Sequence, residues 1–158
     1  WLFTILAGPH QPIWKIYVLK NNVLIDTSVW IQALRPDGLL KARQIVEQLI
    51  IENRATIIGI IQFELLQGSR TSKEYTKLNE NLKALIYLPV SETMWEHAAS
   101  YAFQLRRKGI TVPTTDMLIA TLAIENQLLL IQLDKHFDLI ATLLPLKTAN
   151  LEQVDLMS

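Results

Sequence analysis

Four acidic side chains fall at the ends of predicted strands or within predicted helices: Asp26, Glu64, Asp116 and Asp134. Clustered carboxylates repel one another, and a hard divalent cation with oxygen ligands is the usual relief. Such an ion activates water and stabilises the charge on a phosphoryl group during in-line displacement. If the fold brings these acids together, the expected cofactor is therefore Mg²⁺ or Mn²⁺, and the expected reaction is hydrolysis of a phosphate ester.

Two of the acids follow short apolar runs that are typical of buried strands. Val23–Ile25 leads directly into Asp26, and Leu128–Ile131 is followed by Asp134. The carboxyl ends of parallel strands share one edge of a sheet, where ligands bind. We therefore expect both acids at that edge, with Thr27 or Ser28 capping the helix after the first strand.

The other two acids fall within predicted helices. Glu64 follows a predicted strand over 55–58, among apolar neighbours and with no cationic side chain within a helical turn. A carboxylate in such surroundings is expected to be paired, protonated or bound to metal. Asp116 falls in the first turn of a helix that runs to Ile124 and that Thr114 or Thr115 is expected to cap.

Each acid also has a structural explanation. Asp26 could be an N-cap, Asp116 could complement the positive end of its helix, and Glu64 could face solvent. Asp134 could be a loop acid, and the nearby Asp138 could be mistaken for it. Their joint placement at one edge is what favours a functional role.

The elements that would position these acids alternate between helices and short apolar strands. This alternation predicts an α/β protein with three α/β/α layers and a mostly parallel central sheet of four to five strands. In the strand order 3-2-1-4-5, the first and fourth strands are neighbours, so Asp26 and Asp134 face each other. The remaining strands are predicted at 86–90 and 146–148, and the remaining helices at 29–34, 39–52, 60–67, 72–85, 91–108 and 136–143.

Length and composition indicate one globular domain. The chain has 158 residues, 50% of them hydrophobic, and a formal net charge of zero, so no global basic field marks it as a nucleic-acid binder. The regular pattern begins near Asn22, which suggests an N-terminal extension over 1–21 and one domain over 22–158. The absence of cysteine excludes disulfides and thiolate metal sites and favours a cytoplasmic setting, and no apolar run is long enough to span a bilayer. The three histidines, His10, His97 and His136, show no zinc-ligand spacing.

Four segments in the right order resemble PIN-domain ribonucleases and, more narrowly, VapC-type toxins of type II toxin–antitoxin pairs. They are VLIDTSVWI at 23–31, FEL at 63–65, GITVPTTDMLIA at 109–120 and LDKHFDLIA at 133–141. The resemblance implies a PIN-like fold from about residue 22 to the C-terminus. It also implies that Asp26, Glu64, Asp116 and Asp134 form the catalytic and metal-binding site, with Asp26 and Asp116 as the direct Mg²⁺ ligands.

The activity that this resemblance implies is endonucleolytic hydrolysis of RNA by a metal-activated water, with dimerisation and inhibition by a small antitoxin. Leu39–Ile51 is apolar enough to offer a groove to an antitoxin helix. Arg106–Lys108 could contact RNA phosphates or could simply suit the end of a helix. Trp30 and Trp95 are expected to be core or dimer contacts rather than base-stacking platforms.

Other classes of protein fit less well. A haloacid-dehalogenase-like phosphatase needs a second acid two residues after the first, where this chain has Ser28. A receiver-type signalling domain needs a phosphoacceptor Asp after the third strand, where Pro89 and Val90 stand. Glycine-rich phosphate loops are absent. A PIN-like RNA-binding or interaction module with little catalysis, or a housekeeping RNA-processing nuclease, remains as the alternative.

Overall fold

The fold is seen in a computed structural model, which describes residues 22–153. The extension predicted over 1–21 therefore lies outside the described residues. Five parallel strands form one sheet in the order β3-β2-β1-β4-β5. This order confirms the prediction that the first and fourth strands are neighbours. The strands are β1 (Val23–Ile25), β2 (Ala55–Ile58), β3 (Ile86–Leu88), β4 (Leu129–Gln132) and β5 (Thr148–Asn150).

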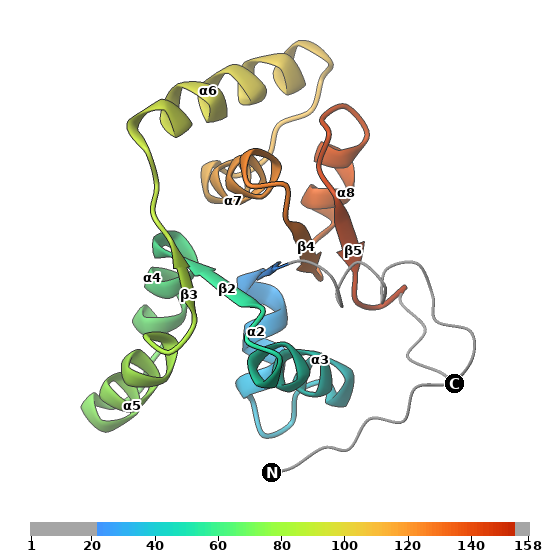
Figure 1. The fold of residues 1–158 in the computed structure, drawn as a ribbon. Helices are drawn as coiled ribbons and strands as arrows, with labels where there is room; N and C mark the ends of the chain where they lie inside the picture. Colours follow the sequence, from blue (N-terminus) through green and yellow to red (C-terminus); the bar gives the residue numbers. More distant parts are fainter. Residues whose placement is uncertain (1–21, 154–158) are drawn as a thin grey trace.

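Helices cover both faces of this sheet, which gives the predicted three-layer α/β/α fold (Figure 1). Figure 1 shows α2 and α3 on one side of the strands and α7 and α8 on the other, with α6 outside α7. The helices are α2 (Thr27–Leu34), α3 (Leu40–Ile51), α4 (Gly59–Gln67), α5 (Ser72–Leu82), α6 (Glu92–Arg107), α7 (Thr114–Glu125) and α8 (Lys135–Ala141). No helix in the described part of the chain is long and apolar enough to cross a membrane.

Strand β1 lies at the centre of the core. Its three residues are fully buried, and Val23 pairs with both Ala55 and Leu129 on the flanking strands. A parallel strand that is covered on both faces is expected to be continuously apolar, as this one is. The first acid of the sequence, Asp26, is therefore fixed at the end of the most enclosed strand.

The structure corrects several predicted boundaries. The last strand is Thr148–Asn150 rather than 146–148, because Leu146 donates its backbone N–H to the carbonyl of Leu144 in a tight turn before pairing with β4 begins. The third strand ends at Leu88, before Pro89, which lacks a backbone donor. Helix α5 ends at Leu82 rather than at residue 85. These shifts leave the carboxyl edge of the sheet where it was predicted.

Candidate active site

Asp26 joins the end of β1 to the start of α2 and is only 5% exposed. Its Oδ2 accepts hydrogen bonds from the backbone N–H of Ser28, at 3.0 Å, and from the Ser28 hydroxyl. Asp26 is thus the N-cap of α2, which begins at Thr27 instead of Val29, and the predicted cap at Thr27 or Ser28 is wrong. Burial raises the pKa of Asp26, the hydrogen bonds oppose this shift, and the charge of Glu64 adds to it.

The Ser28 hydroxyl also ties this acid to the neighbouring strand. Its oxygen accepts the backbone N–H of Leu133, at 3.1 Å, just after β4. Because the same hydroxyl donates to Asp26, one side chain links the carboxyl ends of β1 and β4. The register of these two strands is therefore connected directly to the position of the Asp26 carboxylate.

Glu64 approaches the same edge from α4. It is partly buried, so the solvent-facing alternative is wrong, and its Oε2 accepts a hydrogen bond from the Thr27 hydroxyl. Thr27 follows Asp26 directly, so the first turn of α2 provides a hydroxyl donor to each of these two carboxylates. The effect of Glu64 on the pKa of Asp26 reflects the same proximity.

Asp116 is the third residue of α7, and its side chain is 15% exposed. Pro113 precedes the helix as its N-cap, and no side chain caps it, so the predicted cap at Thr114 or Thr115 is wrong. Burial raises the pKa of Asp116, and the charge of Asp134 raises it further. His136 lowers it, while Asp26 contributes a smaller increase.

Asp134 is the N-cap of α8, and its Oδ1 accepts the backbone N–H of His136 at 2.9 Å. The side chain is 39% exposed, more than that of Asp116. As with Asp26, capping and placement at the edge of the sheet occur in one residue. The structural explanation of these two acids therefore does not compete with a functional one.

The sequence reasoning missed His136. Its Nδ1 lies 2.9 Å from Oδ2 of Asp116 and 3.1 Å from Oδ1 of Asp134. The spacing of the three histidines relative to one another carries no sign of this position, whereas the spacing of two residues between Asp134 and His136 does. That spacing places both side chains in the first turn of α8, facing the start of α7.

The structure brings all four predicted acids to one edge. The charge of Glu64 raises the pKa of Asp26, and the charges of Asp134 and Asp26 raise the pKa of Asp116, so the four acids are close neighbours. Among the described residues, arginine forms ion pairs with Asp37 and with Glu52, and neither of these pairs includes one of the four acids. Clustered carboxylates of which two, Asp26 and Asp116, have raised pKa values suit a divalent cation, and Asp116, Asp134 and His136 offer ligand atoms within 4.8 Å of one another.

Asp138, the acid that could be mistaken for Asp134, has a different role. Its two carboxylate oxygens accept hydrogen bonds from Nε2 of Gln132, at 2.9 Å, and from Nδ2 of Asn150, at 3.4 Å. These bonds attach α8 to the ends of β4 and β5. Asp138 therefore positions the helix that begins with Asp134 and His136.

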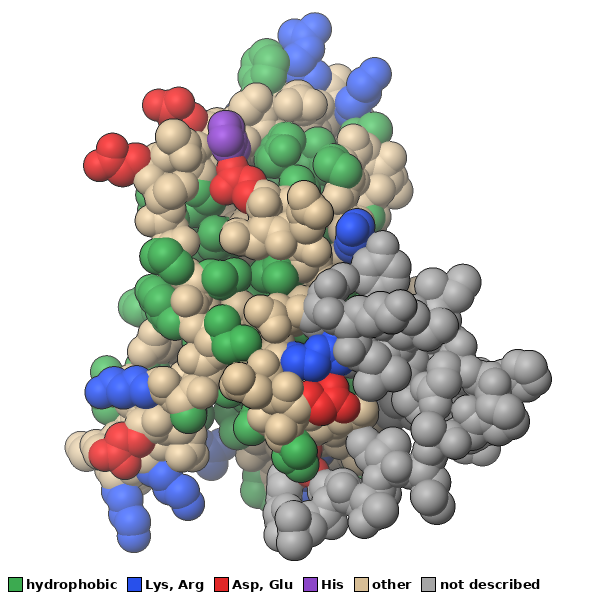
Figure 2. Space-filling view, viewed as in Figure 1, with side chains coloured by type: hydrophobic (Ala, Val, Ile, Leu, Met, Phe, Trp, Pro, Cys, Tyr) green, Lys and Arg blue, Asp and Glu red, His purple; other side chains and the backbone are tan. Residues whose placement is uncertain are grey.

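The basic segment Arg106–Lys108 is exposed at the end of α6, where Figure 2 shows Lys and Arg side chains gathered at the top of the molecule. The Arg107 guanidinium lies 5.7 Å from the centre of the Phe103 ring. Trp30 is buried, as predicted for a core residue. Trp95 is 55% exposed, so it is not a core residue of this chain.

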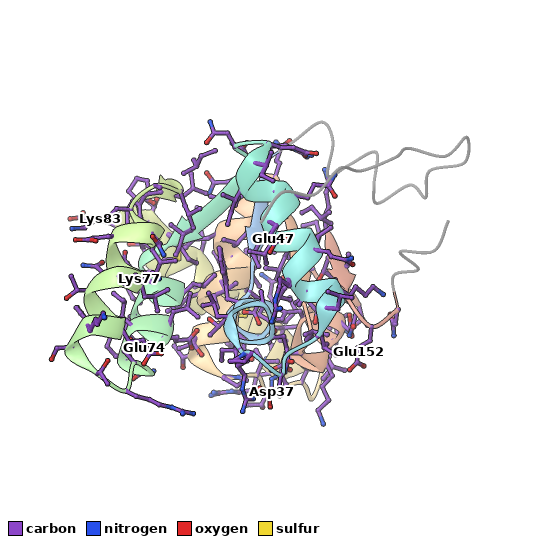
Figure 3. The ribbon with its side chains drawn as sticks, turned by 90° about the horizontal axis from the view of Figure 1, so that it is seen from below. Asp37, Glu47, Glu74, Lys77, Lys83 and Glu152 are labelled. Atoms are coloured by element: carbon purple, nitrogen blue, oxygen red, sulfur yellow. The ribbon has the colours of Figure 1, made fainter. Side chains whose placement is uncertain are left out.

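A groove of about 380 Å³ lies between α2, α3 and α5. Its apolar lining includes Trp30, Leu34, Val46, Ile50 and Leu82. Glu47 of α3, labelled in Figure 3, also lines it and has a raised pKa because of burial. The predicted groove along Leu39–Ile51 therefore exists, and α2 and α5 complete it.

Comparison with known proteins points to one family. The PIN domain profile matches residues 23–143. Ribonuclease VapC11 of Mycobacterium tuberculosis and VapC ribonuclease Mb1587 of Mycobacterium bovis are each 33% identical over 132 residues, covering 81% of this chain and 98% of the relative.

Solved structures share the fold at lower identity. FitAcB from Neisseria gonorrhoeae is 21% identical with a TM-score of 0.69, and covers 84% of this chain and 99% of its own. DNA-bound VapBC from Salmonella typhimurium is 19% identical with a TM-score of 0.67, and covers 83% and 98%. The fold of the chain is therefore that of these proteins.

Proposed function

We propose that this chain, which belongs to the PIN-domain family and within it to the VapC ribonucleases, cleaves RNA endonucleolytically with a divalent metal ion. The proposed role is that of the toxin in a toxin–antitoxin pair. The observation that carries the proposal is the convergence of Asp26, Glu64, Asp116 and Asp134 on the carboxyl edge of one sheet.

Asp26 and Asp116 are the proposed direct ligands of Mg²⁺ or Mn²⁺. Both are largely buried with raised pKa values, and the charge of Asp26 contributes to the raised pKa of Asp116, so they occupy the middle of the acidic row. Glu64 and Asp134 flank them and would hold a second ion or an ordered water. A divalent ion bound here supplies Lewis acidity and an activated water for attack on a phosphodiester. The hydroxyls of Thr27 and Ser28 orient two of these carboxylates.

The RNA substrate is proposed to follow the basic segment at the end of α6. Arg106–Lys108 precedes the loop that leads into α7 and Asp116. Contacts between this segment and RNA phosphates would therefore direct the RNA backbone toward the four acids. Neutralising phosphates with Lys and Arg makes binding depend on salt. Replacing Arg107 and Lys108 with Gln, which leaves Arg106 unchanged, should therefore weaken RNA binding and reduce its salt dependence.

The groove between α2, α3 and α5 is the proposed antitoxin site. Its apolar lining suits an amphipathic helix, and the carboxylate of Glu47 would favour a basic residue on that helix. The solved relatives include a toxin–antitoxin complex from Klebsiella pneumoniae and VapBC from Rickettsia felis with promoter DNA, which supports an antitoxin partner here. Ile50→Lys should weaken capture by a co-expressed antitoxin and leave RNA cleavage intact.

A second copy of the chain is also a proposed partner. The exposed residues Glu92, Trp95, Phe103 and Arg106 lie along one stripe of α6, with the acid and the base at opposite ends. Two copies packed antiparallel would place Glu92 against Arg106 of the other copy. Glu92→Arg alone should dissociate the dimer in sedimentation experiments, and adding Arg106→Glu should restore it. A monomer in all cases, or no change, contradicts this interface.

Cleavage of total RNA by the purified full chain tests the function. The expected result is cleavage with Mg²⁺ or Mn²⁺ that stops with chelator. RNA binding without cleavage under these conditions would instead favour the alternative of a PIN-like binding module. Growth arrest on expression, relieved by the antitoxin, distinguishes a toxin from a housekeeping RNA-processing nuclease.

A further inference from the structure

The imidazole of His136 lies between two of the four carboxylates. Its Nδ1 is 2.9 Å from Oδ2 of Asp116 and 3.1 Å from Oδ1 of Asp134. The backbone N–H of His136 donates to the same Oδ1, so the position of the ring is tied to the cap of α8. The His136 side chain is 28% exposed, whereas that of Asp116 is 15% exposed, so the ring stands at the rim of the site.

These separations fit two different arrangements. They are ordinary lengths for hydrogen bonds from the single N–H that Nδ1 can carry. They also match the spacing between adjacent ligands around an octahedral ion, which is about 3.0 Å when the metal–ligand bonds are about 2.1 Å. One ring atom near two carboxylate oxygens can therefore either hold the carboxylates together or join them in binding an ion.

Ligand chemistry separates the candidate ions. Mg²⁺ prefers an all-oxygen shell, whereas imidazole nitrogen favours first-row transition metals. Two carboxylates with one imidazole form a mixed set that Mn²⁺ accepts more readily than Mg²⁺. We propose that Nδ1 of His136 is a metal ligand in this chain, beside Asp116 and Asp134, and shifts the preference of the site from Mg²⁺ toward Mn²⁺; this rests on the proposed function, which places a divalent ion against Asp116 and a second ion or a water against Asp134.

Direct titration of Mn²⁺ and of Mg²⁺ into the metal-free full chain tests this assignment. His136→Ala should weaken Mn²⁺ binding about tenfold or more, because a ligand is lost, and should change Mg²⁺ binding by less than about threefold. His136→Asp restores an oxygen ligand, so it should strengthen Mg²⁺ binding relative to Mn²⁺. His97→Ala is the matched control, because His97 pairs with Glu125 between α6 and α7 and should leave both affinities unchanged.

A spectroscopic measurement detects a nitrogen ligand on the ion directly, so the assignment of His136 does not rest on affinities alone. Electron spin-echo envelope modulation of the Mn²⁺-loaded chain should show a directly coupled nitrogen in the wild type and in His97→Ala, but not in His136→Ala or His136→Asp. An unchanged ratio of Mn²⁺ to Mg²⁺ affinity in His136→Ala, or no coupled nitrogen in the wild type, overturns the assignment and leaves the proposed function standing. A wild-type chain that binds neither ion overturns both.

Discussion

The two halves of the acidic edge are held in different ways. Asp26 and Glu64 accept hydrogen bonds from the hydroxyls of Ser28 and Thr27 in the first turn of α2. Asp116 and Asp134 lie instead on either side of His136. Hydroxyls orient carboxylates without competing for a cation, whereas an imidazole can itself become a ligand. One half is thus fixed within the protein, and the other can respond directly to the identity of the ion.

The largest expected effect comes from the two central acids, one in each half. Asp26→Asn and Asp116→Asn should each reduce RNA cleavage by about a thousandfold, or about 4 kcal/mol of transition-state stabilisation. Asn keeps the shape of the side chain and, at Asp26, the capping ability, so circular dichroism should show an intact fold. Cleavage assays at saturating Mg²⁺ measure the effect, with Asp37→Asn as the exposed control. Near-normal cleavage in either variant would mean that the halves do not share one site.

A smaller effect is expected when the hydroxyl support of the first half is removed. Ser28→Ala deletes the donor to Asp26 and the acceptor for the backbone of Leu133. Urea unfolding should show a loss of about 1–2 kcal/mol, because a partly buried N–H loses its partner. Cleavage should fall by about tenfold, since the backbone bond from Ser28 to Asp26 remains. Ser100→Ala on the exposed face of α6 should change neither quantity, and equal losses in both variants would contradict this role for Ser28.

The second half depends on the placement of α8. Gln132→Leu removes the hydrogen bond from the buried Nε2 of Gln132 to Asp138. The expected cost is about 1 kcal/mol in the free energy of unfolding, with a fall of a few fold in cleavage. Adding Asp138→Leu to this variant should cost less than the sum of the two single changes, because they break one network. Strict additivity would show that Gln132 and Asp138 act separately.

The smallest effect is the dependence of stability on pH in the metal-free chain. Both central carboxyls have raised pKa values in the folded protein, mainly through burial. A raised pKa means that the folded state holds protons which the unfolded state releases, so stability falls as the pH rises from the ordinary carboxyl pKa through the folded value. Asp26→Asn should flatten this slope and raise the melting temperature at pH 7 without metal. Added divalent ion should stabilise the wild type more at pH 7 than at pH 4.5, and the opposite order would contradict the assigned shifts.

Much of this site followed from local sequence patterns. The continuously apolar run before Asp26 predicted a central parallel strand, and the strand order 3-2-1-4-5 placed the strand that leads to Asp134 next to it. The N-cap of α2 was predicted at Thr27 or Ser28 instead of Asp26. An acid that ends a strand and an acid that caps a helix occupy the same place in the sequence pattern, so the pattern does not distinguish them. His136 was missed because its partner on α7 is distant in the sequence, and only the packing of two helix starts brings them together. The exposure of Trp95 likewise depends on which face of α6 meets α7.

Restoration of cleavage by an ion tests the central claim most directly. The full chain is freed of metal with a chelator, dialysed, and assayed on total RNA with increasing Mg²⁺ or Mn²⁺. The account predicts no cleavage without an ion, recovery on adding either ion to the wild type, and no recovery in Asp26→Asn or Asp116→Asn at the same concentrations. Cleavage by the metal-free wild type, or full recovery in both variants, would contradict the assignment of this acidic edge as the metal-dependent active site.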